Sequence, residues 1–173
     1  MLDSAGNLTI CPEQIVVVGG GRWARVLTGV LCGFVAPSVK IFLHTSHNVD
    51  SMSSWITSQN FEQDIVVSSN WPDVSPELTA AMIVVNAARD HEKTIERALK
   101  ARIPILVEKP VTFSEKATKR LVNLANKNNV PFFSAHVFLF ASYLKNFFLV
   151  IPKIEKVQCL RIFWVDPQIE SRY

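Results

Sequence analysis

The sequence predicts an α/β protein built on a doubly wound parallel sheet. Short apolar segments alternate with segments of helical periodicity through most of the chain. Each apolar segment is nearly continuous, which is typical of parallel strands that are buried on both faces. A cluster of three glycines directly follows the first apolar segment. Because crossovers between parallel strands are right-handed, these observations together favour one sheet with helices on both of its faces.

The expected elements follow one another in a regular order. Strands are expected at residues 15–18, 38–44, 64–68, 81–86, 104–107 and 130–134. Helices are expected between these strands, at residues 22–34, 49–60, 90–101 and 114–128. Asp90 and Ser114 have the short polar side chains that cap helix N-termini, so we expect the last two of these helices to begin there.

The last part of the chain has a different pattern. Residues 138–150 are a bulky apolar helix candidate, and residues 156–165 have the pattern of one long strand. We therefore expect residues 1–135 to form one domain, and residues 136–173 to supply a linker helix and the first strand of an incomplete second domain. A single strand needs a partner, which would be missing sequence, a second copy of the chain or the edge of the first sheet. Pairing with a second copy would give a homo-oligomer.

The composition argues against several classes of protein. The 173 residues are 49% hydrophobic and carry a net charge of +3 without a run of lysines and arginines, so no nucleic-acid partner is expected. Three cysteines that lie far apart indicate free thiols and a cytoplasmic protein. The N-terminus lacks a secretory pattern, and the apolar run at residues 137–151 is interrupted by polar residues, so no membrane segment is expected. No metal site is expected, because His44 and His47 lack a supporting cluster of cysteines or carboxylates.

The glycine cluster has the spacing of a dinucleotide-binding turn. Gly19, Gly21 and Ala24 follow the pattern G-x-G-x-x-G/A between an expected strand and an expected helix. Gly19 would allow the tight turn, Gly21 would let the backbone approach a pyrophosphate, and Ala24 would let the helix pack close to the strand. The N–H groups at the start of that helix would then face the phosphates. The motif alone leaves a purely structural turn open, because glycine turns join strands to helices in many proteins.

The end of the second expected strand bears on the choice of cofactor. Enzymes that use NAD usually have Asp or Glu there, which binds the 2′-hydroxyl of the ribose. Residues 44–48 contain no acid. We therefore expect NADP in preference to NAD, with Thr45, Ser46 and Arg22 as candidate contacts to the 2′-phosphate. NAD remains the alternative, because Asp50 lies close by in the sequence.

Glu108, Lys109 and Pro110 directly follow the fifth expected strand. Parallel sheets bind ligands at the carboxyl ends of their strands, so this acid and this base would face the same edge as the glycine turn. A lysine at such a place can hydrogen-bond a hydroxyl or carbonyl group and help to move a proton during hydride transfer. An ordinary ion pair at a strand end, followed by a turn proline, is the alternative interpretation.

The order of these motifs resembles the Gfo/Idh/MocA family of glucose–fructose oxidoreductases and inositol dehydrogenases. The resemblance rests on the strand with Gly-Gly-Gly-Arg-Trp-Ala, the segment from Asn86 to His91, and Ile-Leu-Val-Glu-Lys-Pro, and it extends from about Gln14 to Pro167. It implies an N-terminal Rossmann domain that binds NAD or NADP. It also implies a C-terminal α/β domain that holds a sugar, a polyol or a related small-molecule substrate.

The resemblance also implies roles for individual residues. Lys109 would be the catalytic lysine, and Asn86 and Ala87 would lie near the ribose and the nicotinamide. His91 would either contact the cofactor or pack at the helix terminus. The candidate cofactor-binding residues are then Gly19, Gly20, Gly21, Arg22, Trp23, Ala24, His44, Thr45, Ser46, Asn86, Ala87, His91, Glu108 and Lys109.

The chain departs from the family pattern in two respects. It has Asn86-Ala87 where the family often has Thr-Pro, and it contains only the beginning of the domain in which the family places a carboxylate and a histidine that work with the lysine. We therefore expect the cofactor-binding half of an NAD(P)-dependent oxidoreductase, with little or no turnover by this chain alone. A non-catalytic nucleotide-binding or structural module is the alternative. Glu108-Lys109-Pro110 argues against a nucleotide-binding module outside redox chemistry.

Overall fold

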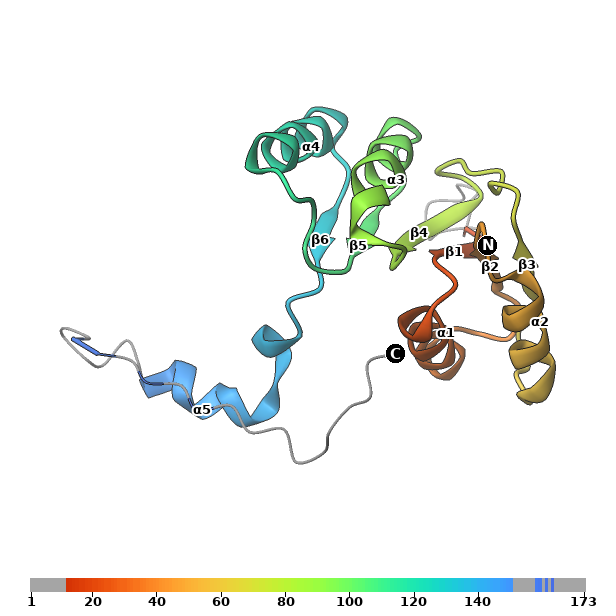
Figure 1. Cartoon of the computed structure of the whole chain (residues 1–173), viewed down its shortest axis with the longest axis horizontal. Coiled ribbons are helices and arrows are strands. Elements are labelled where there is room, and N and C mark those ends of the chain that lie inside the picture. Colours follow the sequence, from red (N-terminus) through yellow and green to blue (C-terminus); the bar gives the residue numbers. More distant parts are fainter. Residues whose placement is uncertain (1–11, 151–157, 160, 162, 164–173) are drawn as a thin grey trace, which may run out of the picture. The chain divides into compact units, whose positions relative to one another are not determined.

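The fold is a six-stranded sheet in which every neighbouring pair of strands is parallel (Figure 1). It is taken from a computed structural model that describes residues 12–150, 158, 159, 161 and 163. The strands lie in the order β3-β2-β1-β4-β5-β6. The chain begins in the middle of the sheet with β1, adds β2 and β3 on one side, and then adds β4, β5 and β6 on the other. This is the doubly wound Rossmann arrangement. The predicted fold class is therefore confirmed.

The strands occupy the six segments in which the sequence places them. They are β1 Gln14–Val18, β2 Lys40–His44, β3 Ile65–Ser68, β4 Thr79–Val84, β5 Ile105–Val107 and β6 Phe132–Ser134. Val18 at the end of β1 pairs with His44 on one side and with Val84 on the other. The carboxyl ends of these three central strands therefore lie at the same edge of the sheet. The prediction for β4, residues 81–86, is two residues late at both ends. The pairing of this strand with β1 begins at Thr79 and ends at Val84.

Helices cover both faces of the sheet. They are α1 Arg22–Phe34, α2 Val49–Ser58, α3 Ala88–Lys100 and α4 Glu115–Asn128. One apolar cluster joins Ala24 of α1 and Met52 of α2 to the sheet, and another joins Leu99 of α3 and Leu121 of α4 to it. Figure 1 shows α3 and α4 on one side of the strands and α1 and α2 on the other. The sheet is thus the middle layer of three.

Only one of the two predicted helix caps is correct. The Ser114 hydroxyl accepts a hydrogen bond from the Ala117 N–H at 3.3 Å, so Ser114 caps α4 as predicted. The prediction of Asp90 as a cap is wrong, because α3 begins at Ala88 with Ala87 in the cap position. Asp90 lies in the first turn of α3, where a negative charge favours the helix dipole. Contacts of residue 86 with later residues of α3, described below, hold this earlier start.

The chain divides into two compact units, and the second begins at Val137. Residues 138–150, predicted as one helix, form a 3₁₀ helix η1 Val137–Phe140 and a helix α5 Ser142–Val150. The predicted strand at residues 156–165 lies mostly outside the described residues, so a homo-oligomer formed through it stays a prediction. That the second unit begins a substrate domain also stays a prediction. Among the described residues, no helix is both long enough and apolar enough to cross a membrane.

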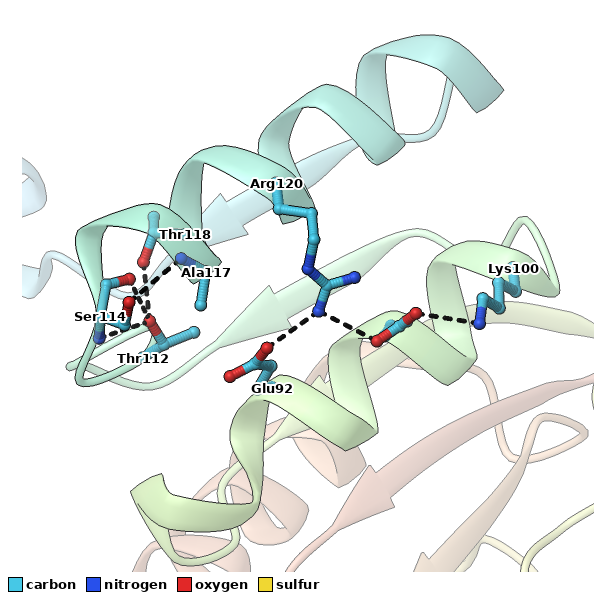
Figure 2. A network of polar contacts seen from close by, with 8 residues as sticks. Glu92, Lys100, Thr112, Ser114, Ala117, Thr118 and Arg120 are labelled. Carbon is cyan, nitrogen blue, oxygen red and sulfur yellow. Dashed lines mark hydrogen bonds and ion pairs between the residues drawn. The ribbon is translucent and has the colours of Figure 1, made fainter.

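A charged network joins α3 to α4. The Arg120 guanidinium on α4 lies 2.9 Å from a carboxylate oxygen of Glu92 and 3.0 Å from one of Glu96, both on α3 (Figure 2). Lys100 approaches the other oxygen of Glu96 at 2.9 Å. Hydrogen bonds from Arg120, and then from Lys100, lower the pKa of Glu96 to about 2. Because these side chains are partly exposed, salt will weaken the network.

The low pKa of Glu96 predicts an acid-sensitive contribution to stability. A carboxylate with a depressed pKa in the folded state stabilises the protein above its unfolded pKa of ~4.3, and the contribution is lost as the pH falls towards the folded value. We expect the free energy of unfolding to fall between pH 4.5 and pH 2, and to fall less steeply in Arg120→Gln. Urea unfolding at a series of pH values measures this difference. Equal slopes for the two proteins would contradict the assignment, and Lys116→Gln, which removes a charge of α4 outside the network, is the control.

Candidate cofactor-binding site

At two of the three clustered glycines, a side chain would clash with neighbouring protein atoms. Gly19 has a φ of +153°, and a Cβ at this position would lie 2.8 Å from the carbonyl oxygen of Val85. A Cβ at Gly20 would lie 2.8 Å from the Cβ of Thr45. The turn after β1 therefore passes between the chain that leaves β2 and the chain that leaves β4. No residue with a side chain fits at Gly19 or Gly20 without a shift of backbone or of a buried side chain.

The third glycine faces open space. A Cβ at Gly21 would have no heavy atom within 4 Å. Gly21 precedes α1 and has no side chain with which to cap the N–H groups of the first turn. The Asn48 amide donates a hydrogen bond to the carbonyl oxygen of Gly20 at 3.0 Å, which fixes the turn from the side of α2. Gly21 and the start of α1 thus face open space from a turn that the protein holds on both sides.

A cavity of about 540 Å³ lies beside this turn. Small-molecule sites usually have volumes of ~300–1,000 Å³, so this cavity has the size of such a site. The cavity is formed at the carboxyl ends of β1, β2 and β4, where doubly wound sheets bind ligands. Its lining residues are Val18, Gly19, Gly20, Gly21, His44, Thr45, Ser46, His47, Asn48, Trp71, Val85, Asn86, Ala87, Arg89, Asp90, Lys93, Thr94 and Arg97.

The cavity brings together most of the predicted cofactor-binding residues, although not all of them. Those in its lining are Gly19, Gly20, Gly21, His44, Thr45, Ser46, Asn86 and Ala87. Arg22 lines a separate hollow of about 330 Å³ with Gly20 and Gly21. Trp23 is exposed, and Ala24 is fully buried between α1 and the sheet. His91, Glu108 and Lys109 are in neither lining. The cofactor contacts of all these residues stay predictions.

Sequence reasoning missed one wall of the cavity. Trp71 follows β3, and its ring lies edge-on to the ring of His44 with 5.2 Å between centroids. The Arg97 guanidinium lies 4.1 Å from the centroid of the Trp71 ring. Arg89 and Lys93 of α3 line the same cavity. The sequence does contain a signal for this wall. Basic residues recur every four positions at 89, 93 and 97, and residues four apart lie on one face of a helix.

His91 lies beneath the cavity and connects two loops. Its ring is only 1% exposed, with Nδ1 at 2.8 Å from the carbonyl oxygen of Pro110 and Nε2 at 3.1 Å from that of Asn86. The Asn86 amide also donates to the Thr94 hydroxyl at 3.0 Å. These contacts hold residue 86 against α3 and explain the early start of that helix. They also tie the cavity edge to the turn that carries Lys109.

The side chains of Glu108 and Lys109 do not form an ion pair with each other, which was the alternative interpretation of this motif. A carboxylate oxygen of Glu108 accepts a hydrogen bond from the backbone N–H of Lys109 at 3.1 Å. The backbone N–H of Glu108 donates to Val84 at 2.9 Å, which extends the pairing of β4 and β5 by one residue. Among the described residues, no carboxylate forms a salt bridge with the Lys109 ammonium, and the side chain is exposed. The charge is therefore available to a ligand.

Comparison with known proteins identifies the family. Residues 14–136 match the GFO_IDH_MocA family, described as an oxidoreductase family with an NAD-binding Rossmann fold. The chain belongs to this family. No curated protein that was compared with the chain matches it.

No group of three His, Cys, Asp or Glu side chains that could hold a metal ion occurs in the part of the chain that the structure describes.

Solved structures of several oxidoreductases share the fold of this family member. Myo-inositol 2-dehydrogenase from Lactobacillus plantarum is 13% identical in sequence, with a TM-score of 0.66. The match includes 83% of this chain and 42% of the dehydrogenase chain. Scyllo-inositol dehydrogenase from Lactobacillus casei, with bound NAD(H) and scyllo-inositol, is 16% identical with the same coverages and TM-score. Biliverdin reductase from Synechocystis sp. PCC 6803, with biliverdin and NADP⁺, is 16% identical with a TM-score of 0.63, and 84% of this chain covers 45% of that chain. The chain thus spans less than half the length of these proteins.

We predict that Gly19→Ala destabilises the fold. The substitution places a Cβ against the Val85 carbonyl at a positive φ, so we expect the free energy of unfolding to fall by about 1–3 kcal/mol. Urea unfolding followed by circular dichroism measures the loss. Gly29→Ala in α1 is the matched control, because its Cβ meets no atom within 4 Å and alanine favours a helix. Equal stability of the Gly19→Ala variant and the wild type would contradict this account of the turn.

We predict that His91→Leu destabilises the protein as well. The change leaves the carbonyl oxygens of Asn86 and Pro110 without their ring partner, which costs about 1–3 kcal/mol. Thermal and urea unfolding provide the measurement. His136→Leu is the control, because His136 is exposed and its ring makes no hydrogen bond among the described residues. If the two variants were equally stable, the bracing role of His91 would be wrong.

Proposed function

We propose that this chain binds NAD(P) in the cavity at the carboxyl ends of β1, β2 and β4, as the cofactor-binding part of an oxidoreductase. The proposed substrate is a sugar, a polyol or a related small molecule. The observation that carries the proposal is the open space in front of Gly21 and the start of α1, beside a cavity of about 540 Å³. The proposal also rests on membership of an oxidoreductase family with an NAD-binding Rossmann fold.

The residues around the cavity suit the parts of a dinucleotide. The N–H groups at the start of α1 would bind the pyrophosphate, with Gly21 allowing its close approach. Asn86 and Ala87, which follow β4, would lie beside the ribose and the nicotinamide. When bound, the cofactor supplies or accepts the hydride.

Lys109 is the proposed catalytic residue. Its ammonium group would donate a hydrogen bond to the reacting oxygen of the substrate and hold or release the proton there. The side chain is exposed and forms no salt bridge with a described carboxylate. His91 would act on Lys109 indirectly, because it holds the carbonyl of Pro110, the next residue.

We favour NADP over NAD as the cofactor. His44 ends β2, and the side chains that line the cavity directly after it are neutral or imidazole groups. A carboxylate at this place would repel a 2′-phosphate, and none occurs among the lining residues 44–48. Structures of this fold with NAD(H) and with NADP⁺ are both known, so the fold is compatible with either cofactor.

A non-catalytic nucleotide-binding module is the second candidate. It is favoured by one observation, namely that neither Glu108 nor Lys109 lines the cavity. Both candidates require dinucleotide binding, and they differ in whether Lys109 takes part in hydride transfer.

The proposal is tested by isothermal titration calorimetry with NADH and NADPH. We expect both to bind, and NADPH to bind more tightly. Gly21→Val should fold normally, because a Cβ at this position meets no heavy atom within 4 Å. It should lower both affinities ~10-fold or more by blocking charge-assisted hydrogen bonds to the pyrophosphate.

Gly33→Ala, at an exposed position near the end of α1, is the control for that variant. Absence of binding of both dinucleotides at millimolar concentration would overturn the proposal. Full binding by Gly21→Val would overturn the placement of the pyrophosphate alone.

A further inference from the structure

Helix α3 separates its charges onto two faces. Glu92 and Glu96, four residues apart, face Arg120 of α4 (Figure 2). Arg89, Lys93 and Arg97, also spaced by four, line the cavity on the other face. Glu92 and Glu96 are therefore paired with a neighbouring helix, whereas Arg89, Lys93 and Arg97 border the cavity.

The basic face is only partly neutralised from within the protein. Arg89 pairs with Asp90 at 3.7 Å, and Asp90 is the only carboxylate in the cavity lining. Within the part of the chain that the structure describes, no carboxylate pairs with Lys93 or Arg97. Two positive charges of the cavity wall are thus left for an anionic ligand.

Arg97 is held in place by a contact that preserves its charge. Its guanidinium lies 4.1 Å from the centroid of the Trp71 ring, and Trp71 lies edge-on to His44 at the end of β2. The His44 ring is fixed in turn by Nδ1, which is 3.1 Å from the carbonyl oxygen of Asn70. A cation–π contact positions a guanidinium without neutralising it, so its N–H groups can still meet a phosphate in a bidentate manner. The wall from β2 to α3 therefore presents a cation that is already oriented.

This basic patch is distinct from the expected pyrophosphate site. The pyrophosphate is expected at Gly21 and the start of α1. Gly19 of the same turn lies against Val85, close before α3, whereas Arg97 lies nine residues beyond Ala88, about 13 Å from there along the axis of α3. A ligand that uses both places needs a second anionic group far from the first. NADP(H) has such a group in its 2′-phosphate, and NAD(H) does not.

We propose that Lys93 and Arg97 form the subsite for the 2′-phosphate of NADP(H), and that they determine the preference for this cofactor. This inference rests on the proposed function. It places the specificity in α3 and the β3–β4 loop, although the sequence had indicated Arg22, Thr45 and Ser46. Arg22 lines a different hollow, and Thr45 is only 5% exposed beneath Gly20.

The test compares NADPH and NADH in calorimetric titrations of the wild type and of the double variant K93Q/R97Q. We expect the variant to bind NADPH at least ~10-fold more weakly, which corresponds to the loss of a charge-assisted hydrogen bond, and to bind NADH within twofold of the wild type. We also expect added NaCl to weaken NADPH binding more than NADH binding, and this difference to shrink in the variant. Lys100→Gln is the matched control, because it removes a positive charge of α3 that does not line the cavity.

The possible outcomes separate the inference from the proposed function. Loss of NADPH and NADH affinity by the same factor, or no loss of either, would overturn the subsite and leave dinucleotide binding intact. Unchanged NADH affinity in the double variant also shows that it is folded. If the wild type binds neither cofactor, the proposed function fails and the subsite fails with it.

Discussion

The passage of the chain between two neighbouring strand ends is the constraint on which the rest of the site depends. β1 lies in the middle of the sheet, and the chain leaves β2 and β4 on either side of it. The turn after β1 has to fit between Thr45 and Val85, and only glycine at positions 19 and 20 leaves enough room. Because these contacts fix the turn, Gly21 and the start of α1 face outward. The open space in front of Gly21 therefore follows from how the turn is packed between the neighbouring strand ends.

His91 extends this order from the glycine turn to the proposed catalytic lysine. Asn86 lines the cavity beside the turn, and Pro110 directly follows Lys109. One buried imidazole contacts the carbonyl oxygens of both residues. A carbonyl oxygen only accepts, so the ring satisfies whichever carbonyl faces its N–H, as the tautomer decides, and loss of the ring removes this buried donor. The cavity and the turn that carries Lys109 are thus connected through α3, although Lys109 does not line the cavity.

Local patterns were sufficient for the sheet and insufficient for the site. Continuous apolar runs located all six strands, because burial on both faces leaves a direct mark on the sequence. Ser114 was recognised as a cap because capping is local, whereas Asp90 was misjudged because His91 and Thr94 bind Asn86 from within the helix. Trp71 and its contact with Arg97 join segments 26 residues apart and have no motif. Contacts of this kind depend on tertiary packing that a single sequence does not display.

Helix α3 contributes to stability, and by the proposal above it would contribute to binding as well. The side chains of a helix that borders a cavity meet three environments, namely the core, a neighbouring helix and the open space. In α3, the core side is made by fully buried apolar residues such as Leu99, Glu92 and Glu96 meet Arg120, and Arg89, Lys93 and Arg97 line the cavity. Were the basic residues placed only for solubility, they would be expected to pair with the acids of their own helix at i,i+4, as Lys100 does with Glu96. Their separation onto the cavity face costs those pairs, and the proposed 2′-phosphate would be the partner that compensates for this loss.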